Sequence, residues 1–333
     1  MRKKILAFLT FLFLPLSMSA CNRGDNKIVV AEVTRSIFYA PFYVALNDGY
    51  FTNEGLDVSV ITTPGADKTM AALLSKEAQV GLMGPEASIY VYNNGQENYA
   101  INFAQLTQKD GSFLVSRDYY ENFTFDDLKG KTIIGGRLGG MPEMILEYVL
   151  KSKGYDVGRD DPSKEIYVRT DVQFDVMAGA FSSGEGDFVS LFEPSATQIE
   201  KLGLGYIVAS LGQESGNVPY TCFSSLKSYH ESNDKYIQKF TNAIYKALKW
   251  VNNTESEIIA KKIKSSFPAT SDEELITVLN RYKSIEAWPN DLTLSEESFD
   301  KLQYIVELAG ELNKKAPYNK LVDTRYSIEA TIK

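Results

Sequence analysis

A short run of polar and aromatic residues can hold a planar small molecule. Arg35, Ser36, Phe38 and Tyr39 stand close together directly after an apolar segment. Aromatic rings offer wide apolar contact faces, and neighbouring polar groups fix the orientation of a guest molecule. The alternative role for Phe38 and Tyr39 is packing at the start of a helix. The run therefore predicts a binding site only if it faces a cleft.

Two carboxylates stand beside prolines where strands are expected to end. In Gly84-Pro85-Glu86 the glycine lets the backbone approach a ligand, and Glu86 also suits a helix start. In Phe192-Glu193-Pro194 the carboxylate can close over a ligand, or the segment is a structural turn. If Glu86 and Glu193 both face one cleft and stay ionised, they repel a plain oxyanion and favour a molecule with N–H donors.

A glycine-rich segment, residues 135–141, is the strongest local signal for a loop that wraps a ligand. Its sequence, GGRLGGM, includes Gly139 and Gly140, which free the backbone to follow the outline of a guest. It is not a nucleotide motif, because it lacks the GK[ST] ending and the GxGxxG spacing. Arg137 can pair with an anionic group of the ligand or with a carboxylate of the protein itself.

Three further residues, Gln108, Asp110 and Tyr220, lie in segments expected to connect two parts of the fold. They can line the cleft, or they can form hydrogen bonds within the connections without touching a ligand.

These candidates need a framework of strands and helices to bring them together. Short runs rich in β-branched residues predict strands, and apolar residues three and four apart predict helices. We expect strands at residues 28–33, 56–61, 78–83, 132–134, 167–169, 188–192 and 206–210. We expect helices at residues 41–48, 68–75, 86–93, 142–153, 234–251, 272–283 and 295–313. This alternation predicts an α/β fold with largely parallel sheets, whose strands carry the site at their carboxyl ends.

The N-terminus predicts export and a lipid anchor. Residues 1–20 read as a signal peptide, because three basic residues precede an apolar run that is too short to span a membrane. The segment closes with Met18-Ser19-Ala20-Cys21, which resembles a bacterial lipobox, although Met18 departs from the usual leucine. We therefore expect lipidation at Cys21, a tether at residues 21–27 and a location on the extracytoplasmic face of the cell membrane.

Charge and cysteine content exclude several classes of protein. Without the three basic residues of the signal peptide, 32 basic and 43 acidic side chains leave a net charge of about −11, so nucleic acid is not an expected partner. Only Cys222 remains after lipidation of Cys21, so no disulfide framework can form. The sequence holds no GxSxG, HExxH or clustered Cys/His metal pattern, and we expect no metal, no cofactor and no catalysis. Its one histidine, His230, lies in a polar run and is expected to be solvated.

Four ordered segments resemble a known family of ABC-transporter substrate-binding proteins, which includes nitrate-, aliphatic-sulfonate- and thiamine-pyrimidine-binding members. The segments are YAPFYVALNDGYFTNEGLDVSVI (residues 39–61), AALLSKEAQVGLMGPEASIY (71–90), DLKGKTIIGG (127–136) and AGAFSSGEGDFVSLFEPSA (178–196). The resemblance implies a periplasmic-binding-protein type 2 fold, with two α/β lobes and a ligand cleft between them. Lobe one would hold residues 28–107 and 222–333, and lobe two residues 112–217.

The resemblance also implies a function: capture of a small molecule by lobe closure and delivery to an ABC permease and its ATPase. We expect a monomer that binds a heterocyclic, pyrimidine-like ligand, because Phe38, Tyr39, Glu86 and Glu193 combine aromatic faces with acceptors. Three alternatives stay open: the same fold binding a sulfonate or other oxyanion, a sensory receptor that signals to a histidine kinase, and an enzyme resembling a pyrimidine synthase known on this fold.

Overall fold

The computed structural model describes residues 26–332. The predicted signal peptide, the lipidation site Cys21 and most of the predicted tether lie outside the described residues. No helix within residues 26–332 is both long and apolar enough to cross a membrane.

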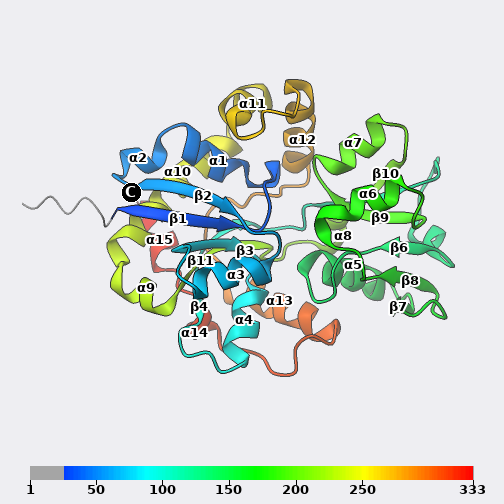
Figure 1. The fold of residues 1–333 in the computed structure, drawn as a ribbon, viewed down its shortest axis with the longest axis horizontal. Helices are drawn as coiled ribbons and strands as arrows, with labels where there is room; N and C mark the ends of the chain where they lie inside the picture. Colours follow the sequence, from blue (N-terminus) through cyan, green and yellow to red (C-terminus); the bar gives the residue numbers. More distant parts are fainter. Residues whose placement is uncertain (1–25, 333) are drawn as a thin grey trace, which may run out of the picture.

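Two mixed sheets form the frameworks of two lobes (Figure 1). The five-stranded sheet has the order β2 (Asp57–Thr62), β1 (Lys27–Glu32), β3 (Val80–Met83), β11 (Thr221–Leu226), β4 (Ala100–Thr107). The six-stranded sheet has the order β10 (Tyr206–Ser210), β5 (Ser112–Ser116), β9 (Phe188–Phe192), β6 (Thr132–Ile134), β8 (Ile166–Arg169), β7 (Val157–Arg159). We call the bodies built on them the first lobe and the second lobe.

Each sheet is parallel apart from one strand. In the first lobe β11 pairs antiparallel with both β3 and β4, while β1 pairs parallel with β2 and β3. In the second lobe β5 is antiparallel to β9 and β10, while β6 is parallel to β8 and β9. The predicted class, two α/β lobes with mostly parallel sheets, is confirmed.

Helices surround both sheets (Figure 1). The second lobe carries α5 (Met141–Ser152), α6 (Met177–Ser182), α7 (Ser195–Lys201), α8 (Leu211–Ser215) and the 3-10 turns η2 (Phe125–Leu128) and η3 (Phe174–Val176). The remaining elements are η1 (Ile37–Tyr39), α1 (Ala40–Asn47), α2 (Tyr50–Asn53), α3 (Ala66–Leu74), α4 (Glu86–Asn93), α9 (Lys227–Ser232), α10 (Asp234–Asn252), α11 (Ser256–Ile263), η4 (Lys264–Ser266), α12 (Asp272–Ser284), α13 (Glu296–Leu308), α14 (Tyr318–Leu321) and α15 (Arg325–Ile332).

The apolar periodicity correctly identified the buried helix faces. In α10 the residues three and four apart, from Ile237 to Val251, are all buried. In α5 the apolar face is likewise buried, and Pro142 lies in the first turn, where its missing N–H costs nothing. Most predicted boundaries lie within two residues of the observed ones. The largest difference is the helix expected at 295–313, which ends at Leu308 because Gly310 adopts a φ of 76°, which terminates an α-helix.

The strands that connect the lobes were not predicted from periodicity, although the family resemblance implies hinge strands near residues 106–113 and 217–223. β4 and β5 flank the first crossing, and β11 follows the second. Their residues are almost all buried, so they lack the alternation of apolar and polar side chains that marks a half-exposed strand.

The expectation of a solvated His230 was wrong, because its side chain is buried. Its Nδ1 lies 3.1 Å from Ser225 Oγ, and its Nε2 lies 3.0 Å from Asp323 Oδ2. Asp323 is far away in sequence and directly precedes α15, which packs against α10 and β4. The histidine thus ties the C-terminal helix to the first lobe.

Replacing His230 should therefore weaken the fold. We expect His230→Ala to lower the free energy of unfolding by about 1–3 kcal/mol, because it removes a buried imidazole and takes away the hydrogen-bonding partner of the buried Ser225 hydroxyl. Urea denaturation followed by circular dichroism measures this. Glu231→Gln is the matched control, because Glu231 forms an exposed pair with Lys227 and such pairs contribute little. Equal stability of the two variants would contradict the assigned role.

Candidate ligand-binding site

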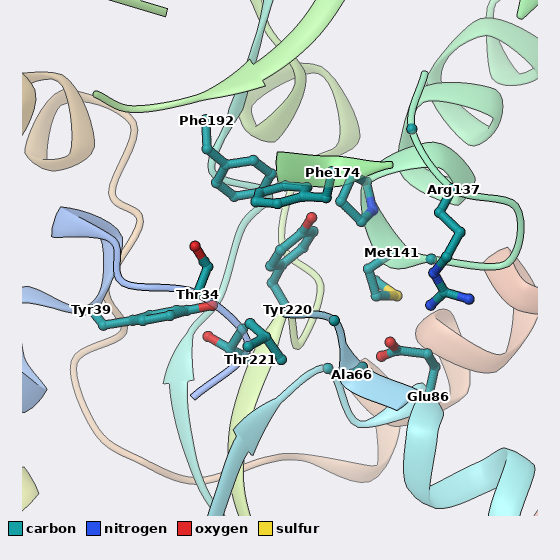
Figure 2. A pocket seen from close by; sticks show the side chains of 16 residues that line it. Thr34, Tyr39, Ala66, Glu86, Arg137, Met141, Phe174, Phe192, Tyr220 and Thr221 are labelled. Atoms are coloured by element: carbon teal, nitrogen blue, oxygen red, sulfur yellow. The ribbon is translucent and has the colours of Figure 1, made fainter. Parts of the chain in front are cut away.

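A cavity of about 100 Å³ lies between the two lobes (Figure 2). The first lobe contributes Val33, Thr34, Tyr39, Gly65, Ala66, Gly84, Glu86, Tyr220 and Thr221, and the second lobe contributes Gly136, Arg137, Gly140, Met141, Pro142, Phe174 and Phe192. Aromatic and apolar side chains form most of the lining, and a few polar groups converge on the interior. This combination is typical of small-molecule sites.

Sheet topology brings these distant residues together. β1 and β3 are parallel neighbours, so Thr34 after β1 and Glu86 after β3 lie at the same sheet edge. In the second lobe β6 and β9 are parallel neighbours, so Arg137 and Phe192 meet in the same way. Loops at the carboxyl ends of parallel strands form the crevice of open α/β folds.

Glu86 is the most unusual polar group of the cavity. Its residue is only 3% exposed, and its Oε2 has no hydrogen-bonding partner among residues 26–332. Burial raises the pKa of this carboxyl to about 7, against the opposing effects of a backbone hydrogen bond and the charge of Arg137. A buried acceptor without a partner costs free energy, so this oxygen can accept a hydrogen bond from any donor that enters the cavity.

Aromatic rings from both lobes line the part of the cavity away from this carboxylate (Figure 2). Phe192 of β9 lies 5.5 Å from Phe174 and 5.9 Å from Tyr220, measured between ring centroids. Tyr39 of η1 completes the wall on the side of the first lobe. A flat ring inserted here would contact apolar faces contributed by both lobes.

The predicted candidates divide into three groups in the structure. Tyr39, Gly84, Glu86, Arg137, Gly140 and Tyr220 line the cavity. Ser36 and Glu193 line an adjacent hollow, and Gly139 lines a third depression beside Glu86. Phe38, Gln108 and Asp110 line none of these three cavities.

Phe38, Gln108 and Asp110 instead contact protein groups near the two crossings between the lobes. Phe38 is fully buried and packs against Tyr282 with ring centroids 4.9 Å apart, and its carbonyl accepts a hydrogen bond from Trp288. The Gln108 amide donates to the carbonyl of Glu286. Asp110 Oδ1 accepts a 2.6 Å hydrogen bond from the Ser112 backbone, and burial raises its pKa to about 6.

Glu193 faces a protein cation instead of the cavity. Its Oε1 accepts from Arg281 of α12 at 2.6 Å, and both its oxygens accept hydrogen bonds from Thr197. Arg281 also bonds Glu200 at 2.8 Å. Of the two carboxylates expected to face one cavity, only Glu86 lines it, and the charge of Glu193 is already neutralised by Arg281.

Polar contacts join the lobes on both flanks of the cavity. On one flank, Arg281 of the first lobe contacts Glu193 of the second lobe. On the other flank, Arg137 Nη2 of the second lobe lies 3.7 Å from Asp67 Oδ1 of the first lobe. Arg159 of the second lobe contacts Glu311 at 3.0 Å. The described conformation therefore has the lobes in contact around the cavity.

Several lining residues were missed in the sequence. Thr34 and Phe174 were not singled out, although each follows a predicted strand. Phe174 carried the clearest signal, because it is a large apolar residue in a polar segment after β8. Within residues 26–332 no group of three or more His, Cys, Asp or Glu side chains is placed to hold a metal ion.

Comparisons with known proteins identify the family. The family model described as "NMT1/THI5 like" matches residues 37–258. A Bacillus subtilis (strain 168) protein named "Putative binding protein YtlA" is 47% identical over 322 residues, which cover 96% of this chain and 95% of that protein. The chain belongs to the NMT1/THI5-like family.

Solved structures share the fold of this family member. The nitrate-binding protein NrtA from Synechocystis PCC 6803 superposes with a TM-score of 0.72 at 17% identity, covering 92% of this chain and 88% of that one. The alkanesulfonate-binding protein SsuA from Xanthomonas axonopodis pv. citri superposes with a TM-score of 0.71 at 14% identity, covering 90% and 98%. At these identities the likeness concerns the fold.

The buried Glu86 should make stability depend on pH. Its pKa is about 7 in the folded protein against 4.5 for the free side chain, so between these values the native state binds more protons than the unfolded state. The free energy of unfolding then falls as pH rises through this window. We expect Glu86→Gln to be more stable than the wild type at pH 8 by about 1–3 kcal/mol, with little difference at pH 4.5. Urea denaturation at both pH values measures this.

Glu77→Gln is the control for this experiment, because Glu77 is exposed on the same lobe. If Glu86→Gln and wild type lose stability in parallel between pH 4.5 and 8, the buried carboxyl does not titrate as described.

Proposed function

We propose that this protein is the extracytoplasmic solute-binding component of an ABC-type importer and that it captures a small heterocyclic, pyrimidine-like molecule between its lobes. The observation that carries the proposal is the buried, unpartnered Glu86 carboxylate in an aromatic-lined cavity built by both lobes. A carboxylate accepts hydrogen bonds from ring N–H or exocyclic amino groups, and the rings supply contact faces.

An oxyanion is the second candidate ligand, and Arg137 is the observation that favours it. Its guanidinium lines the same cavity, and a guanidinium fork matches sulfonate or carboxylate oxygens. The partial pairing of Arg137 with Asp67 and the presence of Glu86 weigh against this choice, because a buried carboxylate repels an anion.

Export and delivery belong to the same proposal. Cleavage of residues 1–20 and lipidation of Cys21 would anchor a monomer to the outer face of the membrane, where a permease and its ATPase accept the ligand. Residues 28–107 with 222–333 would move as one lobe and residues 112–217 as the other. Membership of a family whose curated relative is named as a binding protein supports a binding role over the enzyme alternative. A sensor that signals to a kinase shares every feature of this site.

Calorimetry with a ligand panel tests the ligand class. We expect aminopyrimidines such as cytosine to bind wild-type protein, and Glu86→Gln to weaken this binding by about 10- to 100-fold, since a hydrogen bond to a charged group contributes about 1.5–3 kcal/mol. Glu77→Gln should bind like the wild type. Tight binding of nitrate or propanesulfonate, with no binding of heterocycles, would overturn the heterocycle proposal and favour the oxyanion.

Small-angle scattering tests capture by closure. Ligand that contacts both lobes shifts an open-closed equilibrium towards the compact form, so the radius of gyration should fall on saturation. Arg281→Met should enlarge the ligand-free protein and weaken binding, because it leaves Glu193 buried without its cation. Lys246→Gln, which removes an exposed charge remote from the cavity, should change neither quantity. A radius that stays constant under saturating ligand would exclude closure.

A further inference from the structure

A second hollow of about 270 Å³ opens beside the cavity between the same two lobes. It shares Val33, Thr34, Phe174 and Phe192 with the first cavity, so the Phe174 and Phe192 rings stand at the boundary of the two spaces. Small-molecule sites typically enclose roughly 300–1,000 Å³. The volume of the first cavity alone is well below that range, whereas the two volumes together reach it.

The second hollow differs from the first in chemistry. Hydroxyl groups, one guanidinium and two carboxylates contribute its polar lining: Thr34, Ser36, Thr62, Ser190, Ser195, Arg35, Asp175 and Glu193. Ser190 on β9 is only 2% exposed, and its Oγ has no hydrogen-bonding partner within the described part of the chain. Leaving a hydroxyl buried and unpaired costs about 1–3 kcal/mol, so Ser190 marks a place where a guest supplies the missing hydrogen bond.

Arg35 lies at the edge of this hollow, and some of its N–H donors are not used by the described part of the protein. Its Nε donates to Glu32 Oε1 at 3.2 Å, and the structure shows no hydrogen bond from its two terminal nitrogens to any of residues 26–332. Glu32 itself is fixed by the hydroxyls of Tyr43 and Thr62. The guanidinium is therefore positioned by a buried carboxylate while its outer N–H groups stay available.

The charges around the hollow favour a neutral guest. The carboxylate of Glu193 is engaged by Arg281 and Thr197, and that of Glu32 by Arg35 and its neighbours. Asp175 of η3 lies exposed at the rim with its acceptors open to solvent. A phosphate would meet Arg35 and Asp175 together, so attraction and repulsion would largely offset each other.

We infer that the second hollow is a subsite for a polyhydroxylated, sugar-like group attached to the ring in the first cavity. Sugar hydroxyls donate and accept at once, which suits a lining that offers guanidinium donors, carboxylate acceptors and serine hydroxyls. The faces of Phe174 and Phe192 supply the apolar surface against which the C–H groups of a sugar pack. The inference rests on the proposed function and narrows its ligand to a heterocycle glycoside.

A graded set of ligands tests the subsite by calorimetry: cytosine, cytidine and cytidine 5′-monophosphate. We expect cytidine to bind the wild type at least about tenfold more tightly than cytosine, since two net hydrogen bonds contribute about this factor. The phosphate should add no further affinity. In Ser190→Ala and Arg35→Lys the ratio of cytidine to cytosine affinity should fall to about threefold or less, while cytosine affinity stays within about twofold of wild type.

Ser183→Ala is the matched control, because Ser183 is an exposed hydroxyl of the same lobe, and it should keep the wild-type ratio. Cytidine binding no tighter than cytosine overturns the subsite while leaving the proposed function intact. Monophosphate binding at least about tenfold tighter than cytidine also overturns it, in favour of an anion site. Failure of cytosine itself to bind counts against the pyrimidine ligand and the subsite that depends on it.

Discussion

Glu86 lies buried between two lobes with one carboxylate oxygen unpaired in the described structure, and this arrangement is unfavourable for the protein alone. Desolvation raises the pKa of the group to about 7. Near neutral pH folding therefore costs free energy, either because a charge is buried or because the carboxyl must take up a proton. Under the function proposed above, a guest that donates hydrogen bonds would remove this cost, and binding would favour the conformation in which both lobes line the cavity.

The ion pairs at the cavity edges complement this arrangement. Arg281 neutralises Glu193 and Glu200 across the lobe boundary, and Arg137 approaches Asp67 on the opposite flank. Buried and half-buried charges require partners. These pairs therefore stabilise the contact between the lobes, and their side chains leave the cavity open. Glu86 is thereby distinguished from Glu193 and Glu200, whose charges Arg281 neutralises.

The prediction of the fold succeeded where physical signals are local. The strand at Phe188–Phe192 and the helix at Glu86–Asn93 agree with the sequence analysis at both ends, because apolar runs and prolines act over a few residues. The prediction of the site was less complete. Glycine-rich loops and strand ends pointed to Gly140, Glu86 and Tyr39, which line one cavity in the structure. Phe38 instead packs in the core against Tyr282 and Trp288, which lie far along the chain.

The sequence by itself determined the α/β class, the alternation of strands and helices, and the strand ends at which polar residues gather. These follow from periodicity, helix signals and side-chain type, which are properties of neighbouring residues. Only the tertiary structure decided which carboxylate stays unpaired, since Glu86 and Glu193 look alike in sequence and only Glu193 meets Arg281. It also decided that His230 is buried, since the Asp323 partner approaches only when the C-terminal helix packs against the first lobe. Pairing of charges depends on distances in space, and segments remote in sequence set those distances.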